Sequence, residues 1–381
     1  MKIVGFGRCA FSAFAAITML SGCIASRSVI GAQAEVQPGV APLRVTIPKC
    51  NNGRIGHATC EVLVQRGARR SDKARGWTPH DLQLAYKLPS SSKGIGQIVA
   101  VVDAYDNPDA ASDLAEYRST FKLPTANFTK YNQEGQTSNY PAGSPEWGVQ
   151  IDIDVEMVSA SCPNCTIYLV EANSDSASDL EASEAEAVSL GAHIVSNSYV
   201  GEGFSNSYFD TPGVTYLGSG PEVGSGEAAY PADFDGVVAV GGTLLGKIGG
   251  KRGWSEGVWP SDGGGCIKGQ QKPPWQHDQY CKHRLANDVS AVADGVAAYD
   301  SYDEDGWISA EGTSFPAPFL AGVFGLAGNA AKQNGGKTFW QPTHQKHLYP
   351  VGEGNGSECA YAEGNYDTCT GWGSPHGIGA F

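Results

Sequence analysis

The sequence predicts an α/β protein with a doubly wound parallel sheet in one large domain. Short, continuously apolar runs, typical of buried parallel strands, alternate with helix-like stretches. The 50 glycines supply turns between these segments. A hydrophobic content of 41% over 381 residues is enough for a single large core. The strand-like runs span 97–106, 166–172, 192–200, 213–219 and 237–243, and the helical stretches span 149–160 and 176–191.

A short helix is expected within residues 78–91, before the first of these strands. Thr78 is its N-cap, Pro79 stands in its first turn, and Asp81 completes a capping-box pattern. Residues 246–310 show no regular pattern and are expected to be irregular. The tail from residue 340 is expected to be a disulfide-closed segment of the same domain.

The N-terminus predicts export. Lys2 and Arg8 lie before an apolar run over residues 9–20. This run has the length of a signal-peptide core and is too short to span a bilayer. The run ends in "LSGC", which resembles the processing box of bacterial lipoproteins and makes Cys23 the lipidated residue. The alternative is an ordinary secretory signal cut a few residues later. We expect a signal peptide at 1–22, a lipid tether and short extension at 23–76, and the large domain at 77–381, on the outer face of a bacterial membrane or else secreted.

The cysteines support an oxidising compartment. Of ten, Cys9 falls in the signal and Cys23 is the lipid candidate, so eight remain in four close pairs. A zinc site is not expected at the CPNC of 162–165, because no second CxxC and no close histidine pair accompany it. The predicted disulfides are Cys50–Cys60, Cys162–Cys165, Cys266–Cys281 and Cys359–Cys369.

The charge balance argues against a nucleic-acid partner. The net charge is −14, and removal of residues 1–22, which carry two basic and no acidic side chains, makes it −16. The sequence shows no second transmembrane stretch and no repeat. A monomer that meets peptides or proteins is expected.

A serine in "EGTSFPAPFLAGV" (311–323) is the candidate nucleophile. Ser314 would lie at the start of a helix, where free backbone N–H groups could stabilise an oxyanion. A serine hydroxyl needs a neighbouring base to take its proton. In subtilisins that base is a histidine in an HGTH-type helix start, but none of the eight histidines here has that context.

From about Trp77 to Phe381, the chain resembles the sedolisins, or serine-carboxyl peptidases, which share the subtilisin-like fold. The matching landmarks, in chain order, are "TPHDLQLAYKLPSS", "IVAVVDAYDNP", "DVEMVSASCPNCTIYLVEANS", "IVSNSY", "YPADFDGVVAVGGTLL", "NDVSAVAD", "EGTSFPAPFLAGV" and "TGWGSPHGIGAF". The resemblance implies a subtilisin-like domain at 77–381 and endopeptidase chemistry in acid.

In this family a Glu and an Asp four residues apart, on one helix face, replace the histidine. The resemblance puts the Asp at Asp154 and the Glu position at Gln150. A neutral amide cannot act as a base. Asp152 would point elsewhere on the helix, and Glu146 lies one turn away, so neither is a ready substitute.

Further family positions are also altered. Glu222, preceded by Pro221, stands where the family has the Asp that helps stabilise the oxyanion. Ser196, Asn197 and Ser198 would line the peptide groove, but Val200 replaces a glycine that leaves room for the peptide.

The family's calcium site is altered as well. It would be formed by Asp367 with carbonyls at Val351 and Asn365, but Pro350 replaces the other Asp ligand. Calcium takes about six to eight oxygens, so the loss of one carboxylate ligand is expected to weaken its binding.

Two hypotheses follow. The first is an exported sedolisin-like endopeptidase whose activity is reduced by Gln150. The second is an inactive pseudopeptidase, a surface lipoprotein that binds peptides or a protein.

Overall fold

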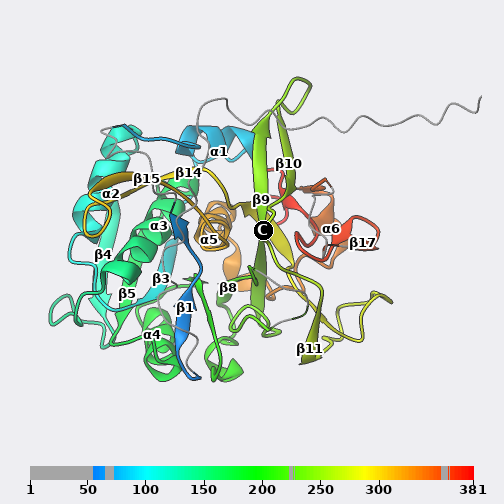
Figure 1. The fold of residues 1–381 in the computed structure, drawn as a ribbon, viewed down its shortest axis with the longest axis horizontal. Helices are drawn as coiled ribbons and strands as arrows, with labels where there is room; N and C mark the ends of the chain where they lie inside the picture. Colours follow the sequence, from blue (N-terminus) through cyan, green and yellow to red (C-terminus); the bar gives the residue numbers. More distant parts are fainter. Residues whose placement is uncertain (1–54, 65–72, 223–225, 227, 353–358, 360) are drawn as a thin grey trace, which may run out of the picture. The chain divides into compact units, whose positions relative to one another are not determined.

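A mainly parallel sheet forms the centre of the computed structural model (Figure 1). The structure describes residues 55–64, 73–222, 226, 228–352, 359 and 361–381. The strand order is β10-β9-β8-β6-β3-β5-β4, and β13 also pairs with β9. All of these neighbours are parallel except β10 and β9. The strands are β3 (Ile98–Ala104), β4 (Asn127–Asn132), β5 (Thr166–Ala172), β6 (Ile194–Asn197), β8 (Thr215–Ser219), β9 (Val237–Lys247), β10 (Trp254–Val258) and β13 (Val289–Val292).

The strand order confirms the predicted doubly wound sheet. From β3 the chain passes to β4 at the edge of the sheet, returns to β5 beside β3, and then continues on the other side of β3 with β6 and β8. The winding therefore reverses between β3 and β6. In open α/β sheets, ligands bind at the carboxyl ends of the strands at such a reversal, and the candidate site lies there.

Helix α3 (Pro145–Ser161) is the central helix of the domain. Its N-cap Ser144 accepts a hydrogen bond from the backbone of Trp147, and Pro145 opens its first turn. Every residue from Trp147 to Ser161 is buried, because α3 packs against helices α1, α2 and α5 and against the sheet. The helix is thus enclosed all round although it carries several carboxyl groups.

Three further helices complete this arrangement. Helix α1 (Pro79–Ala85) has the predicted capping box, with Thr78 and Asp81 bonding reciprocally. Helix α4 (Ala177–Ser189) packs on β3 and β5, and α5 (Pro316–Ala327) follows the candidate nucleophile and ends at Gly328 in the left-handed conformation. The strand and helix predictions above are confirmed. The sequence missed α2 (Ala110–Thr120) and β4.

The expectation that residues 246–310 are irregular was wrong. Beside β10 and β13, this region holds β11 (Cys266–Gln271), β12 (His283–Leu285), β14 (Val296–Asp300) and β15 (Gly306–Glu311). These strands are short and separated by glycine-rich turns, so their patterns are too brief to indicate strands. Pairing stabilises them: β14 and β15 form a hairpin, and β13 adds to the more distant β9.

The remaining elements are small. Near the start of the described chain lie β1 (Ala58–Cys60) and β2 (Leu63–Val64), and β7 (Tyr199–Gly201) follows β6. Near the C-terminus are α6 (Pro342–Gln345), β16 (Leu348–Tyr349), β17 (Tyr361–Glu363), β18 (Tyr366–Asp367) and β19 (Ser374–Pro375), and two 3-10 turns lie at Asn206–Tyr208 and Ala330–Lys332. The boundary at residue 77 stays a prediction, and strands β1 and β2 on its N-terminal side pair with strands of the domain.

Three disulfides are present, in the pairs that the spacing predicts. They join Cys162 to Cys165, Cys266 to Cys281, and Cys359 to Cys369. Cys60 is also disulfide-bonded, and its predicted partner Cys50 lies outside the described residues. No helix among the described residues is both long and apolar enough to cross a membrane. The predicted signal and Cys23 lie outside the described residues.

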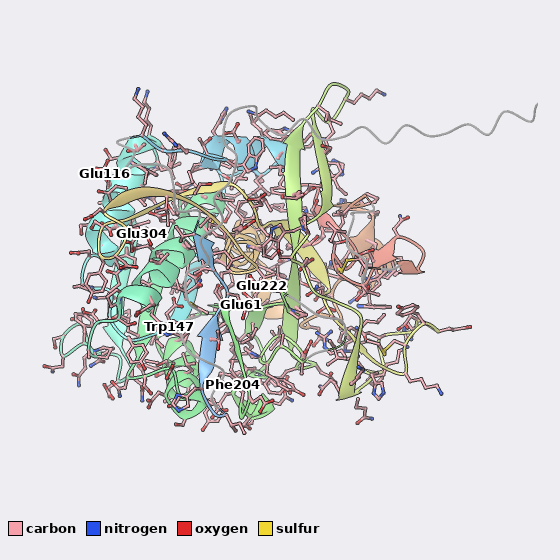
Figure 2. All side chains as sticks on the ribbon, in the orientation of Figure 1. Glu61, Glu116, Trp147, Phe204, Glu222 and Glu304 are labelled. Carbon is pink, nitrogen blue, oxygen red and sulfur yellow. A yellow bond between two sulfur atoms is a disulfide. The ribbon has the colours of Figure 1, made fainter. Side chains whose placement is uncertain are left out.

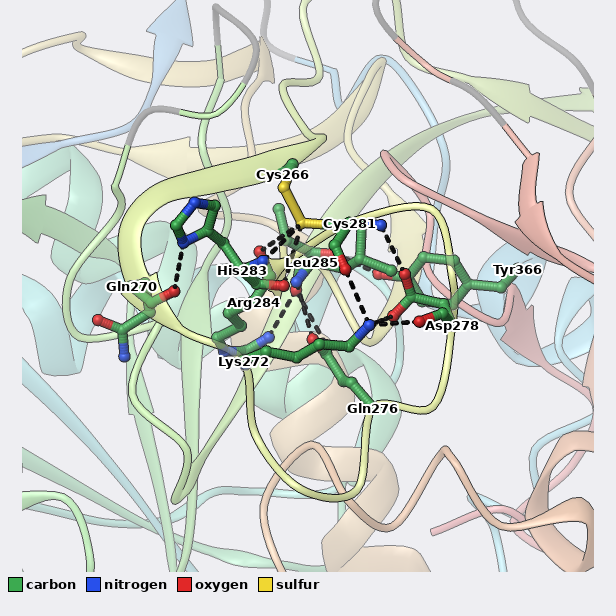
Figure 3. The surroundings of a disulfide bond; sticks show 11 residues. Cys266, Gln270, Lys272, Gln276, Asp278, Cys281, His283, Arg284, Leu285 and Tyr366 are labelled. Carbon is green, nitrogen blue, oxygen red and sulfur yellow. Dashed lines mark hydrogen bonds and ion pairs between the residues drawn. A yellow bond between two sulfur atoms is a disulfide. The ribbon is translucent and has the colours of Figure 1, made fainter.

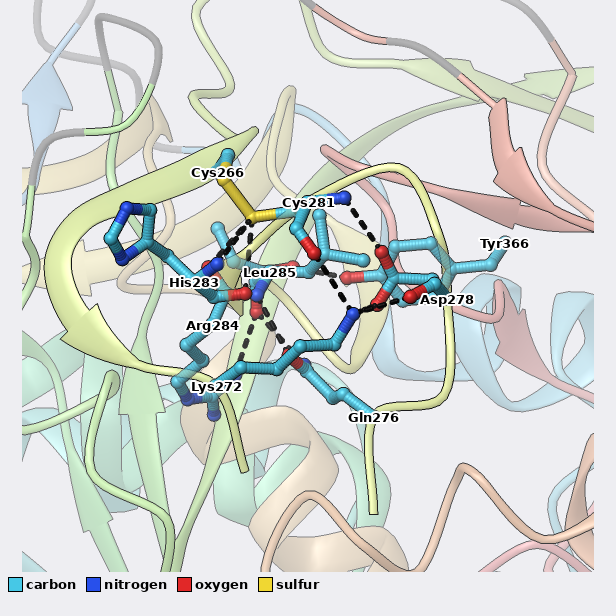
Figure 4. A network of polar contacts seen from close by, with 10 residues as sticks. Cys266, Lys272, Gln276, Asp278, Cys281, His283, Arg284, Leu285 and Tyr366 are labelled. Atoms are coloured by element: carbon cyan, nitrogen blue, oxygen red, sulfur yellow. Dashed lines mark hydrogen bonds and ion pairs between the residues drawn. A yellow bond between two sulfur atoms is a disulfide. The ribbon is translucent and has the colours of Figure 1, made fainter. Parts of the chain in front are cut away.

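The Cys266–Cys281 disulfide closes a loop that is also stabilised by hydrogen bonds and an ion pair (Figure 3). The Lys272 ammonium pairs with the Asp278 carboxylate at 2.6 Å, and Asp278 also accepts the backbone N–H of Cys281. Figure 4 shows the same network at close range, with Arg284 beside it. These contacts hold the loop before β12 independently of the candidate site.

Several carboxyl groups are buried around α3. Asp113, Asp152 and Asp300 come from α2, α3 and β14, and their oxygens lie within 4.8 Å of one another. Burial raises the pKa of Asp152 well above its usual range, and the charges of Asp300 and Glu156 raise it further. Burial likewise raises the pKa of Glu171 to about 9, although Lys130 opposes this.

We therefore expect the protein to be most stable in acid. A carboxyl whose pKa is raised by folding binds protons that the unfolded chain has released, so stability falls as pH rises through the folded-state pKa. Between about pH 4, where unfolded carboxyls titrate, and about pH 8, the thermal midpoint should fall by roughly 5 °C or more. Calorimetry across this range measures it, and a midpoint that rises steadily toward neutral pH would contradict the assignment.

Candidate functional site

The candidate nucleophile lies where the carboxyl ends of β3 and β6 meet the turn before α5. Ser314 is fully buried, one residue before the N-cap of α5. Gly312 in the same turn has a φ of +150°. A Cβ at this position would lie 2.2 Å from the carbonyl oxygen of Glu61, so glycine is required for this close approach.

Gln150 and Asp154 lie on one face of α3, as their spacing predicts. Gln150 Nε2 donates a hydrogen bond of 2.7 Å to Asp154 Oδ1, and both side chains are fully buried. The amide therefore directs its donor toward the carboxylate. Its oxygen, Oε1, has no hydrogen-bond partner among the described residues.

Ser314 is tied to the end of β6 by two reciprocal hydrogen bonds. Ser314 Oγ donates to the backbone oxygen of Ser198 at 3.3 Å, and Ser198 Oγ donates to the backbone oxygen of Ser314 at 3.3 Å. Among the described residues, the hydrogen bond of the Ser314 hydroxyl thus goes to a backbone carbonyl and to no carboxylate. A carbonyl oxygen can orient the hydroxyl but cannot take its proton.

Asp103 is a site residue that the sequence reasoning did not assign. It ends β3, is fully buried, and neither carboxylate oxygen has a hydrogen-bond donor among the described residues. Burial raises the pKa of Asp103 to about 8. Burial also raises the pKa of Asp154, the charge of Asp103 raises it further, and hydrogen bonds from Ser198 and Gln150 oppose the rise. The negative charge of Asp103 therefore opposes ionisation of Asp154. An acidic residue at the end of an apolar strand was the signal that could have indicated it.

Glu222 lies against the turn that holds Ser314, the candidate nucleophile. Its Oε1 accepts hydrogen bonds from the backbone N–H of Thr313 at 2.7 Å and from the Thr313 hydroxyl at 3.3 Å. Figure 2 shows Glu222 beside Glu61 at this turn. The structure thus brings Glu222 next to Ser314, and its role toward an oxyanion stays a prediction.

The three predicted groove residues have different surroundings. Ser198 contacts Ser314, as described above. Asn197 donates to the backbone of Leu217 and accepts from the hydroxyl of Tyr199, so it supports the sheet. Ser196, within β6, is buried and its hydroxyl has no partner among the described residues. Their role as a peptide-binding set stays a prediction.

The edge of β7, where a peptide is predicted to bind, is occupied by the chain itself. Strand β1 pairs antiparallel with β7, and Val200 lies opposite Thr59. The backbone N–H of Ser314 donates to the Glu61 carbonyl at 3.4 Å, and β2 then pairs with β15. The sequence analysis missed this occupant, because strands of two and three residues carry no readable periodicity.

A pocket opens beside the occupied groove. Its volume is about 630 Å³, and it is lined by Glu202, Gly203, Phe204, Ala228, Tyr230 and Phe234. Phe204 approaches Gly201 at the end of β7. The pocket could receive an aromatic or apolar side chain next to the strand.

Calcium binding by Asp367, Val351 and Asn365 stays a prediction. Asp367 Oδ1 accepts the backbone N–H groups of Cys369 and Thr370, so it stabilises a turn. The cysteines beside Asp367 are joined in a disulfide, Asn365 is exposed, and Pro350 offers no side-chain oxygen. These groups do not fit the about six to eight oxygens that calcium takes.

Comparisons with known proteins point to one group of peptidases. Kumamolisin from Bacillus sp. (strain MN-32) is 27% identical in an alignment 349 residues long; the match covers 79% of this chain and 62% of kumamolisin. The chain therefore spans less than two thirds of that relative. No protein-family model matches the chain.

Solved structures share the fold. Pseudomonas sedolisin, a serine-carboxyl proteinase complexed with two molecules of pseudo-iodotyrostatin, is similar with a TM-score of 0.67 and 21% identity, covering 80% of this chain and 96% of that one. Fervidolysin from Fervidobacterium pennivorans, a keratinolytic enzyme related to subtilisin, has a TM-score of 0.51 and 17% identity, covering 78% of this chain and 43% of that one.

Calcium is expected to have little effect on stability. Asp367 stabilises a turn, and the Pro350 side chain offers no ligand atom. Chelation should therefore shift the thermal midpoint by less than about 1 °C. For a domain of this size, a change of about 1 kcal/mol in the free energy of unfolding shifts the midpoint by about 2–4 °C. Thermal unfolding with calcium and with chelator makes the comparison. A rise of several degrees with micromolar calcium would show that other oxygens complete a site.

Proposed function

We propose that this chain, which is similar to kumamolisin and shares the fold of Pseudomonas sedolisin, is a serine-carboxyl peptidase homologue of the sedolisin family with attenuated activity. Ser314 is the nucleophile, Asp154 is the supporting carboxyl, and Gln150 stands at the position of the base. One observation carries the proposal. The side chain that bonds Asp154 across one helical turn is an amide.

The chemistry of the site explains the attenuation. Attack by Ser314 on a peptide carbonyl requires a group that accepts the hydroxyl proton and later gives it to the leaving amine. An amide oxygen accepts a hydrogen bond but does not take up a proton in mildly acidic or neutral solution. Loss of one member of a catalytic triad typically costs about 10⁴- to 10⁶-fold in rate. The wild-type chain should therefore hydrolyse peptides far more slowly than a version with a carboxylate at position 150.

A carboxylate at position 150 would suit the surrounding charges in acid. It would join Asp103 and Asp154 in a buried site, where close carboxyls share protons and one pKa is pushed upward. One shared proton limits the negative charge in the buried site, while the remaining carboxylate accepts the proton of Ser314. With a carboxylate at position 150, the site would therefore be suited to endopeptidase activity in acid.

A second candidate function is binding without catalysis. An antiparallel strand already pairs with β7 beside the buried nucleophile, so the groove is able to hold an extended peptide. A pseudopeptidase would bind a peptide or protein ligand on this surface after β1 had been displaced from β7.

Substitution of Gln150 by Glu should restore peptidase activity below about pH 5, where shared-proton carboxyl pairs titrate. The change adds a proton acceptor at nearly constant volume, so the gain over wild type should be at least about 10³-fold in kcat/KM. A fluorogenic peptide assay from about pH 3 to 7 measures it.

Two variants serve as controls. Ser314→Ala should abolish the gained activity, and Gln136→Glu makes the same chemical change at an exposed position on the turn after β4. Rapid, Ser314-dependent cleavage by wild type would show that another carboxylate is the base. A folded Gln150→Glu variant that cleaves neither added peptides nor its own chain would favour the binding function.

We further propose that the protein is exported and anchored to the outer face of a bacterial membrane as a monomeric lipoprotein. The basis is the "LSGC" box after the apolar run of residues 9–20, together with a chain whose cysteines form disulfides. The anchor would place the peptide groove outside the cytoplasm.

Lipidation predicts that the mature N-terminus is a modified Cys23. Mass spectrometry of protein from membranes should find this residue with acyl chains, and Cys23→Ser should abolish the modification, whereas Cys9→Ser should not change it. An unmodified N-terminal peptide that begins beyond Cys23 would overturn the assignment in favour of secretion.

A further inference from the structure

The peptide groove holds residues 57–64, here named the strap segment. We propose that the strap segment is an intramolecular pseudosubstrate, bound in the register of a substrate, with the Glu61–Val62 peptide bond presented to Ser314. This inference rests on the proposed function, because it assigns Ser314 as the nucleophile. It identifies the occupant of the groove as a piece of the same chain.

The first half of the strap segment is held on both edges. On one edge, the backbone N–H of Ala58 donates to Asp175 at 2.7 Å, and the N–H of Ala177 donates to Gly56 at 2.9 Å. On the other edge, residues 58–60 pair antiparallel with β7. An extended chain inserted between two strand-like segments has its main-chain groups satisfied, which is how a groove binds peptides of varied sequence.

The centre of the strap segment meets the catalytic turn. The Glu61 carbonyl oxygen accepts the backbone N–H of Ser314 at 3.4 Å and lies close to Gly312. In serine peptidases, the N–H of the nucleophile residue helps bind the oxygen of the scissile carbonyl. The carboxyl of Glu222, at the position assigned to oxyanion stabilisation, borders the same turn. These contacts mark the Glu61 carbonyl as the one that a nucleophilic Ser314 would attack.

The second half of the strap segment leaves on the far side of Ser314. Leu63 pairs with Glu311 and Val64 pairs with Ala310, so β2 adds to the edge of the β14–β15 hairpin. The strap segment therefore crosses the whole site, with paired residues before and after the Glu61–Val62 bond. A chain that merely touched the nucleophile would be paired on one side only.

Burial and side-chain contacts hold the strap segment in place. Ala58, Cys60, Glu61, Val62 and Val64 are all buried. Cys60 is disulfide-bonded, and the His57 ring nitrogen lies 2.8 Å from the Asp175 carboxylate. A peptide in solution could enter this part of the groove only after the strap segment had been displaced.

The amide at position 150 explains why the strap segment persists. With a carboxylate there, Ser314 Oγ would attack the Glu61 carbonyl carbon and pass its proton to that carboxylate. The Glu61–Val62 C–N bond would break, and the Val62 amine would receive the proton. One water would then hydrolyse the Glu61–Ser314 ester, restoring the serine hydroxyl and leaving a carboxylate on Glu61. With Gln150 this sequence lacks its proton acceptor.

Hydrogen exchange of the wild-type chain tests the occupancy directly. The amides of residues 58–64 should be protected like those of β7, while residues 249–251 in the exposed β9–β10 turn provide a fast-exchanging reference. Exchange of the strap segment at the rate of that turn would overturn the proposal, whatever the catalytic activity.

Self-cleavage by Gln150→Glu tests the register. At about pH 4, in the range where carboxyl pairs titrate, this variant should lose its intact mass and yield a fragment that begins at Val62. The rate should not depend on protein concentration. The double variant Gln150→Glu with Ser314→Ala should stay whole.

The outcomes of this experiment separate the two proposals. If Gln150→Glu cleaves added peptides while its Glu61–Val62 bond stays intact, the proposed function stands and the pseudosubstrate register is wrong. If it cleaves neither added peptides nor itself, the proposed function fails, and hydrogen exchange alone decides whether the strap segment fills the groove. Cleavage at another bond of the strap segment would also overturn the assigned register.

Discussion

The hydrogen bond between Gln150 and Asp154 is the interaction on which the properties of this site depend. Both side chains are fully buried on α3, and Asp103 adds another carboxyl at the end of β3. A third carboxyl at position 150 would place more potential negative charge in a site with low access to water. The amide relieves this repulsion and still gives Asp154 a donor. It does so at the cost of the proton acceptor that Ser314 requires.

The same interaction accounts for the state of the groove. A serine with an active base, facing the Glu61 carbonyl, would cut its own strap segment. With Gln150, the bond can remain in the site indefinitely, and the extended chain becomes a permanent part of the structure. The neutral side chain and the occupied groove are therefore complementary features. They explain why Ser314 is buried although its turn retains the geometry of a nucleophile.

Much of the fold and part of the site could be predicted from the sequence. Continuous apolar runs identified the parallel strands, and the helical spacing placed Gln150 and Asp154 on one face of α3. Local cysteine spacing gave the three disulfides of the described chain. These features depend on neighbours close in sequence, whose geometry follows from the helix and strand repeats.

The features that were missed depend on distant pairing. Strand β1 is recognisable only through β7, about 140 positions away. The pair of Asp103 and Asp154 joins a strand end to a helix, and the strands in 246–310 are too short to show a period. For β1 and for Asp103 the partner is distant in the sequence, and for the strands in 246–310 the run is too brief, so no local pattern indicates them.

The reactivity of Ser314 toward a fluorophosphonate, which labels activated serines, tests the central claim most directly. The account predicts that labelling of the wild-type chain stays at the level of Ser314→Ala across the acid and neutral range, because the hydroxyl bonds a backbone carbonyl and its neighbour is an amide. Rapid, stoichiometric labelling of Ser314 in the wild-type protein would contradict it, since that result requires both a working base and an accessible nucleophile.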